Sequence, residues 1–266
     1  MAKKIIIQEE INLPGAKGLY AFCCKTVAKL FVIALAILVT AGNIVTGSAA
    51  ASLVSCLWIV HHNARKLEGI DSISSSVHDN CKCKRWRGIA GTICQKCYSY
   101  TQQARHNGLR EHSILNGIIL RTVLIPVAAF KYLPILSRYL RIESFGDVAN
   151  VIQARNYIRI IKAFPGKRCA IWSKNLLIWA EAFRLEGKPD NCTFVYSSPF
   201  IDKIVPEKIV SLYPFIDHIF TVFTKKYAAK NNIDICCGGL KCMECIKAKK
   251  NCYFRGGRLY INELLK

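Results

Sequence analysis

Acidic side chains and proline are scarce in this chain of 266 residues, and glycine is not enriched. With 16 glycines and 8 prolines it is not a collagen-like or low-complexity polymer, and 52% hydrophobic residues exclude a fully disordered chain. The sequence also contains no P-loop, no dinucleotide-binding fingerprint and no conventional catalytic triad. The enzyme classes that these motifs mark are therefore not indicated, and the length favours one sizeable domain or two small ones.

The scarcity of acidic residues leaves a large positive charge. Only 17 Asp and Glu stand against 38 Lys and Arg, which gives a formal net charge of +21. Such a charge repels itself, so it usually faces an acidic partner such as nucleic acid, anionic lipid or a phosphorylated ligand. The basic side chains are dense around two groups of cysteines, so a second interpretation is that they offset anionic thiolate–metal clusters. A plain solvated surface is the third interpretation.

Residues 30–60 carry no charged side chain. A membrane-spanning helix needs roughly 20 apolar residues, and the stretch at about 30–50 predicts such a helix. A buried helix or a cleaved secretory signal would give a similar pattern. The chain thus divides into an N-terminal apolar segment, 1–65, and a domain, 66–266. We expect the protein to be either cytoplasmic or anchored in a membrane with a cytoplasmic domain.

The second half of the chain alternates strand-like and helix-like stretches. Residues 62–80 are polar and predict a linker. The strand-like runs are 140–145, 169–172, 192–196 and 218–223, with 233–235 as a candidate fifth. Strands that alternate with helices at this spacing indicate βαβ units and a parallel sheet. The predicted fold class is α/β, a partial parallel barrel or short parallel sheet with flanking helices, preceded by an apolar N-terminal helix.

Polar residues follow the predicted strands, where parallel α/β folds collect their chemistry. Such residues are partly expected in any loop, because loops are polar and Ser and Asp cap helices. A carboxylate beside the N–H groups of a helix start can bind an amine or a ribose hydroxyl, and a lysine can bind phosphate or carboxylate. The candidate cofactor-binding residues are Glu143, Gly146, Asp147, Lys174 and Ser197.

Nine of the 14 cysteines fall in two compact groups. The first group is Cys81, Cys83, Cys94 and Cys97, and the second is Cys236, Cys237, Cys242, Cys245 and Cys252. Each group contains one Cys-x-x-Cys, a spacing at which two thiolates reach one metal ion. Disulfides are the alternative and would need an oxidising compartment. The predicted metal ligands are Cys81, Cys94, Cys97, Cys237, Cys242, Cys245 and Cys252. The remaining cysteines, in apolar contexts, are expected to be packing residues.

Several motifs occur in order along the chain: TICQKCY, RIESFGD, AIWSKN, FVYSSP and CGGLKCMEC. Over roughly Lys66 to Lys266 this series resembles the phage and prophage proteins called gene product 88-like, which look like reduced relatives of radical S-adenosylmethionine enzymes. The resemblance implies a partial barrel and an iron–sulfur cluster, with S-adenosylmethionine as a second cofactor. It places Cys94 and Cys97 at the end of the cluster motif, and Gly146 and Asp147 near the methionine amine.

The sequence departs from the radical-enzyme motif at one position. That motif is Cys-x3-Cys-x2-Cys, and Ala90 stands where its first cysteine would be. A third ligand would come from Cys81, Cys83 or the second group. We therefore expect a metal-binding protein, with iron–sulfur favoured over zinc, and an enzymatic role of the radical type as one option. The alternative is a non-enzymatic, zinc-stabilised protein that binds nucleic acid through its basic surface.

Overall fold

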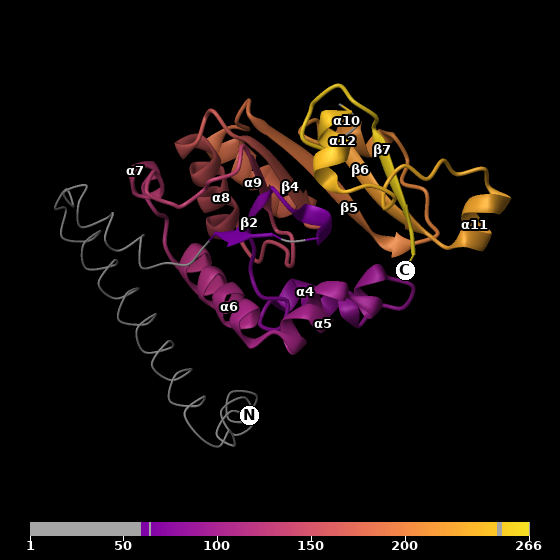
Figure 1. Ribbon diagram of the computed structural model, residues 1–266, viewed down its shortest axis with the longest axis horizontal. Coiled ribbons are helices and arrows are strands. Elements are labelled where there is room, and N and C mark those ends of the chain that lie inside the picture. Colours follow the sequence, from indigo (N-terminus) through magenta and orange to yellow (C-terminus); the bar gives the residue numbers. More distant parts are fainter. Residues whose placement is uncertain (1–59, 64, 249–251, 266) are drawn as a thin grey trace, which may run out of the picture. The chain divides into compact units, whose positions relative to one another are not determined.

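The computed structural model describes residues 60–63, 65–248 and 252–265 of the chain, all of which belong to one compact unit (Figure 1). The apolar helix predicted at about residues 30–50 lies outside these described residues. Within them, none of the helices has the length and apolar character needed to cross a bilayer. The membrane anchor therefore stays a prediction of the sequence.

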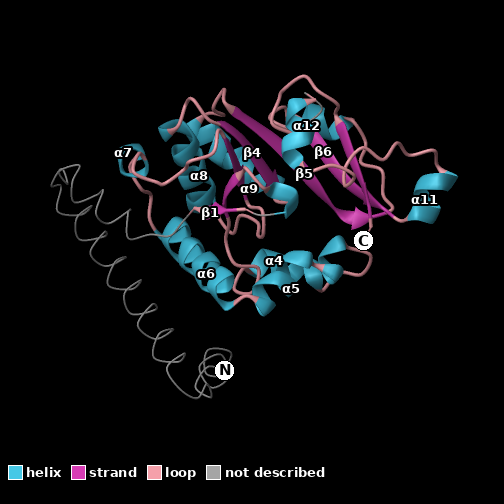
Figure 2. Ribbon diagram, in the orientation of Figure 1, coloured by secondary structure: helices cyan, strands magenta, loops and turns pink. Residues whose placement is uncertain are grey.

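A seven-stranded sheet forms the centre of the described residues, and its strands are ordered as they occur along the chain (Figure 2). The strands are β1 (His61–His62), β2 (Asp71–Ile73), β3 (Tyr139–Ile142), β4 (Arg168–Ser173), β5 (Cys192–Ile201), β6 (His218–Phe223) and β7 (Tyr260–Leu264). β1 pairs with β2 in the antiparallel sense, and every later neighbour is parallel. The predicted α/β class with a mostly parallel sheet and flanking helices is confirmed.

Helices form the crossovers that parallel neighbours require. The short helix η1 (Arg65–Leu67) precedes β2. The long β2–β3 connection contains α4 (Cys81–Arg87), η2 (Ile93–Lys96), α5 (Tyr98–Arg105), α6 (Asn107–Thr122) and α7 (Val127–Phe130). The later crossovers contain α8 (Val151–Ala163), α9 (Leu176–Glu186), α10 (Lys208–Leu212), α11 (Lys225–Lys230) and α12 (Cys242–Lys247). The two longest connections, β2–β3 and β6–β7, are the ones that carry the cysteine groups.

The two faces of the sheet are covered by different parts of the chain. On one face, the ring of Trp179 from α9 lies 5.7 Å from that of Phe194 on β5. Neighbouring residues of a strand point to opposite faces. Accordingly, Thr193 points away from α9, and its hydroxyl donates a hydrogen bond to the carbonyl of Cys252. On that second face the imidazole of His218 also bonds the carbonyl of Phe254, at 3.0 Å. The second cysteine group therefore lies on the sheet face opposite α8 and α9.

Two details of the sequence prediction are wrong. Residues 62–80 are not a polar linker, because they contain the last residue of β1, the short helix η1 and the buried strand β2. The serines after β2 are buried because they bond the next connection: the hydroxyl of Ser74 accepts from the N–H of Ser144 at 3.0 Å. Residues 233–235 form no strand. The last strand is β7, and the N–H groups of Cys236 and Cys237 only reach its Asn262 carbonyl.

Candidate functional site

The helix α4, which carries the first two cysteines of the first group, begins beside the loop that follows β3. Asn80 is its N-cap: the side-chain oxygen accepts from the N–H groups of Lys82 at 2.9 Å and Cys83 at 3.4 Å. The amide nitrogen of the same side chain donates to the carbonyl of Asp147 at 2.5 Å. Asn80 is buried. This one side chain therefore fixes the start of α4 against the carboxyl end of the parallel sheet.

The segment that carries Cys94 and Cys97 is attached to β5. Thr92 forms an isolated antiparallel bridge with Phe200, and the N–H of Ile201 donates to the carbonyl of Gly91 at 3.0 Å. The indole of Trp86, from α4, meets the ring of Phe200 edge to face at 5.9 Å. Helices α4 and η2 are thus held over the end of the same strand.

Lys174 lies near three of the four cysteines of the first group. It follows β4, and its ammonium lies 3.5 Å from the hydroxyl of Ser197, which lies within β5 and not at the strand end where it was predicted. Burial alone would lower the pKa of Lys174, but the nearby thiols of Cys83, Cys94 and Cys97 and the carboxylate of Asp147 outweigh it and raise that pKa. Three of the first four cysteines therefore share one cation as a neighbour.

The three thiols differ from Cys81 in their surroundings. Cys81 is exposed, whereas the other three are partly buried. Burial raises the pKa of the Cys83 thiol well above its ordinary value, and it raises that of Cys94 as well. Cys83 interacts electrostatically with Cys94 and with Asp147. The structure thus places Cys83, which was not among the predicted ligands, beside Cys94 and Lys174, and leaves the predicted ligand Cys81 at the surface.

Glu143 has its carboxylate inside the protein. Its backbone adopts a left-handed φ of 59°. The carboxylate accepts hydrogen bonds from the N–H of Ser75 at 3.0 Å, the Ser75 hydroxyl at 2.7 Å, the Tyr157 hydroxyl at 2.6 Å and the Gln153 amide at 3.2 Å. Burial raises the pKa of Glu143 to about 7. These contacts hold the Glu143 side chain in place, and they join the segments after β2 and β3 to α8.

Asp147 and Gly146 complete this loop. The Asp147 carboxylate accepts from the Ser173 hydroxyl at 2.5 Å and from the backbone N–H of Lys174 at 2.9 Å, which connects the loop after β3 to the end of β4. A Cβ on Gly146 would lie 2.4 Å from the Ser75 carbonyl oxygen. Four of the five predicted cofactor-binding residues therefore lie near one another at a single edge of the sheet. Asp147 contacts Lys174, Lys174 contacts Ser197, and Glu143 lies in the same loop as Asp147.

The second cysteine group has Lys66 as its neighbouring cation. The ammonium of Lys66 lies 3.6 Å from the sulfur of Cys237 and 2.9 Å from the carboxylate of Glu263 on β7. Cys242, at the start of α12, interacts electrostatically with Cys237, Cys245 and Cys252. The two groups therefore occupy two neighbourhoods, one around Lys174 and one around Lys66.

Within this second group Cys236 is exposed, and the other four cysteines are partly buried. Cys252 packs against the apolar cluster of Ile70, Ala170, Ile246 and Tyr253. Its burial raises the pKa of the Cys252 thiol to about 12. Every cysteine that the structure describes is a free thiol. Among these residues, no three His, Cys, Asp or Glu side chains are placed so that they would hold a metal ion without rearrangement.

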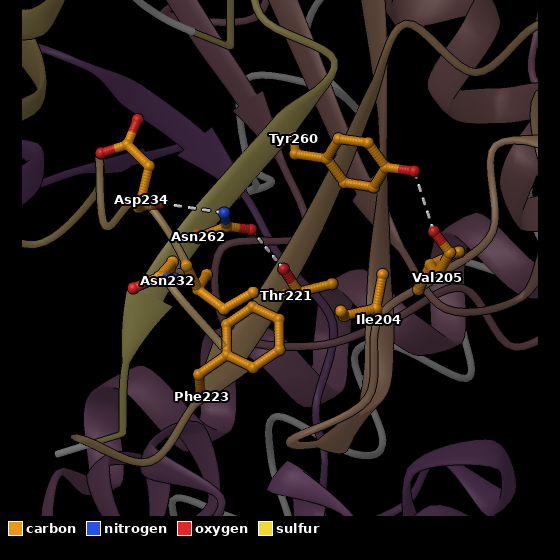
Figure 3. Close-up of a pocket in the computed structure, with 9 residues that line it drawn as sticks. Ile204, Val205, Thr221, Phe223, Asn232, Asp234, Tyr260 and Asn262 are labelled. Atoms are coloured by element: carbon orange, nitrogen blue, oxygen red, sulfur yellow. Dashed lines mark hydrogen bonds between the residues drawn. The ribbon is translucent and has the colours of Figure 1, made fainter. Parts of the chain in front are cut away.

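Two cavities open near the last strand. One, of about 250 Å³, lies between β6, β7 and the segment after α11 (Figure 3). Its polar groups are paired with one another: the Tyr260 hydroxyl donates to the Val205 carbonyl at 2.9 Å, and the Thr221 hydroxyl donates to the Asn262 amide oxygen at 2.6 Å. The other, of about 440 Å³, is lined by residues 235–240 and by Glu263 and Leu264, beside the second cysteine group.

Comparisons with known proteins identify no relative. No family model, no curated protein and no solved structure matches this chain.

Proposed function

We propose that this protein binds an iron–sulfur cluster at the carboxyl end of its parallel sheet, through the thiolates of Cys83, Cys94 and Cys97. The observation that carries the proposal is that α4 and the η2 segment are both held over the end of β5, which brings their thiols near Lys174. Iron–sulfur clusters are held by cysteine thiolates, and a nearby cation offsets the negative charge that such a centre gathers. Binding then requires the three side chains to turn toward one another.

The donor set favours iron–sulfur over zinc at this position. A structural zinc site takes four protein ligands, and this neighbourhood offers three thiols. The nearest carboxylate, Asp147, already accepts hydrogen bonds from Ser173 and Lys174. A cluster with three protein thiolates and one position for a small molecule fits the residues better. In the radical enzymes that the sequence resembles, that molecule is S-adenosylmethionine, and we propose it as the second cofactor here.

The second cysteine group is proposed as a separate metal centre. Cys242 and the three cysteines near it, Cys237, Cys245 and Cys252, provide four thiols, which suits either zinc or a second iron–sulfur cluster. Lys66 lies beside Cys237, as Lys174 lies beside the first group. The two centres are distinguishable because their ligands fall in different segments of the chain.

An enzymatic role of the radical type is the reaction class that this proposal admits. The bound cluster would supply an electron to its small-molecule ligand. Lys174 would hold positive charge beside the cluster, while Glu143, Gly146 and Asp147 would shape the loop that receives the ligand. The strands β2 to β7 run parallel in chain order, which suits a partial barrel of the gene product 88-like phage family. The substrate is not specified by these residues.

Anaerobic purification of the full chain tests the proposal. We expect a brown protein with a visible charge-transfer absorption, and with iron and acid-labile sulfide in comparable amounts. The variants Cys83→Ser, Cys94→Ser and Cys97→Ser should each lose most of the iron assigned to the first group. The matched control is Cys81→Ser, which changes an exposed thiol of the same helix and should keep its iron. A colourless protein with stoichiometric zinc would overturn the proposal.

A further inference from the structure

The helices that carry the first cysteine group also form a strongly basic surface. Residues 81–112, here called the basic cap, comprise α4, η2, α5 and the first turns of α6. They contain seven Lys and Arg against the single acidic residue Glu111. The five exposed basic residues of the cap are Lys84, Arg85, Lys96, Arg105 and Arg110.

Basic side chains elsewhere in the described part of the chain are often paired with carboxylates, and those of the basic cap are not. The single carboxylate of Glu186 pairs with three basic side chains, and the shortest nitrogen–oxygen distance is 2.9 Å. These side chains are Arg155, Arg159 and Lys162. Lys188 pairs with Asp217 in the same way. Of the described carboxylates, none lies within 4.0 Å of a Lys or Arg nitrogen of the basic cap. The charge of the cap is therefore available to an external anion.

Aromatic rings lie among these charges. The guanidinium of Arg87 lies 3.5 Å from the centre of the Tyr100 ring, which itself stacks on His78 at 4.1 Å. The neighbouring Tyr98 is 63% exposed, and its ring stacks on that of Phe145 with centroids 6.4 Å apart. Proteins that bind single-stranded nucleic acid combine a positively charged track with aromatic rings on which bases stack.

We infer that the basic cap binds single-stranded nucleic acid, with phosphates on its exposed Lys and Arg side chains and a base on Tyr98. An anionic membrane would be the other large anion. A helix that lies on a membrane buries an apolar face in it, whereas Tyr98 is the only large hydrophobic residue of the cap that is strongly exposed. The inference goes beyond the proposed metal centre and does not require it, because the five exposed charges are not ligands.

Fluorescence anisotropy with a labelled single-stranded oligonucleotide of mixed sequence tests this inference on the full chain. For single strands, the logarithm of the affinity falls with the logarithm of salt by about 0.7 for each phosphate neutralised. The triple variant Lys84→Gln/Arg85→Gln/Arg105→Gln should therefore lose about 2 from that slope and weaken binding at least roughly tenfold at low salt.

The matched control makes the same change of charge on a helix outside the basic cap. Lys225, Lys226 and Lys230 are exposed residues of α11, at the right of Figure 1, while α4 and α5 lie below the sheet. The triple glutamine variant of α11 should bind almost as the wild type does. An equal loss of affinity in both triple variants would show that only net charge matters, and it would overturn the inference.

Two further measurements separate the contribution of the ring and the nature of the partner. Tyr98→Ala should weaken single-strand binding roughly tenfold without changing the salt slope, because stacking releases no counterions. Duplex that binds as tightly as the single strand would contradict the role of Tyr98.

Vesicles of anionic phospholipid should compete poorly, and vesicles that displace the oligonucleotide at equal phosphate concentration would overturn the choice of partner. Repeating the titration with Cys94→Ser and measuring iron in every variant keeps this result apart from that of the metal proposal.

Discussion

Replacing Glu143 by glutamine changes the titration of a buried carboxyl with little change in its shape. Glu143 is 3% exposed, and its carboxylate accepts four hydrogen bonds from Ser75, Gln153 and Tyr157. A protonated Glu143 can donate to a hydroxyl of Ser75 or Tyr157, because a hydroxyl both donates and accepts. Glutamine keeps one acceptor oxygen for the three donors on that side. Its amide nitrogen faces the backbone N–H of Ser75, which costs about 1–3 kcal/mol for the unpaired donor.

The expected pH dependence follows from the direction of the pKa shift. In the unfolded chain the carboxyl titrates near 4.5, whereas burial raises the pKa of Glu143 in the folded protein to about 7. Between these values the folded protein keeps a proton that the unfolded chain has lost. The stabilisation is therefore fully present below pH 4.5 and is lost as the pH rises to about 7. A shift of this size corresponds to roughly 3 kcal/mol of unfolding free energy.

Urea denaturation of the two proteins at a series of pH values measures this effect. The free energy of unfolding of the wild type, relative to that of Glu143→Gln, should fall by roughly 3 kcal/mol across the window. Glu181→Gln is the control, since Glu181 lies at the surface with Arg184 and its variant should follow the wild type closely. A difference between wild type and Glu143→Gln that stays constant from acid to neutral pH would refute the assignment of a raised pKa to this carboxyl.

Three further predictions concern Gly146 in the loop after β3, the N-cap residue Asn80 of α4, and the thiols of Cys81 and Cys252. Gly146→Ala should lower the free energy of unfolding by roughly 2–4 kcal/mol in a urea titration, because its Cβ would lie 2.4 Å from a backbone oxygen. The control Gly166→Ala, whose Cβ would have no atom within 4 Å, should be almost neutral in the same titration. Asn80→Ala should lower the free energy of unfolding by about 1–2 kcal/mol, because it removes the N-cap of α4. An unchanged urea midpoint would contradict this N-cap geometry. In metal-free protein at neutral pH, Cys252, whose pKa burial raises to about 12, should react with iodoacetamide roughly a hundredfold more slowly than exposed Cys81. Mass spectrometry of the labelled peptides measures both rates, and similar rates would show that Cys252 is accessible.

The parallel sheet could be predicted where its strands are apolar on both faces. β6 was predicted over the same residues that the structure gives, His218–Phe223, because its side chains are buried on either side. β2 was missed for the opposite reason. Its neighbourhood is rich in serine, and a buried serine is stable only when its hydrogen bonds are made. Those partners, such as Ser144 and Glu143, lie about 70 residues further along the chain, so local composition does not reveal them.

The candidate site was predictable in its parts and not in its arrangement. Spacing alone made Cys94 and Cys97 candidates, and the predicted strand ends made Lys174 and Ser197 candidates. The choice between Cys81 and Cys83 depends on the direction in which α4 leaves its N-cap, because residues two positions apart on a helix point to different sides. Asn80 followed by two alternating cysteines was the local signal for that geometry. The position of Lys66 beside the second group depends on the far end of the chain, which no local pattern encodes.

The contact between Lys66 and Glu263 joins segments that are synthesised at very different times. The two residues are 197 positions apart, and Lys66 belongs to the connection just before the first parallel strand. A chain emerging from the ribosome therefore waits for its last strand before this contact and the neighbouring bond to Cys237 can form. Contacts of such high sequence separation slow folding and leave strand edges open meanwhile. Truncation before β7 would thus remove the partner of Lys66 and leave the edge of β6 unpaired.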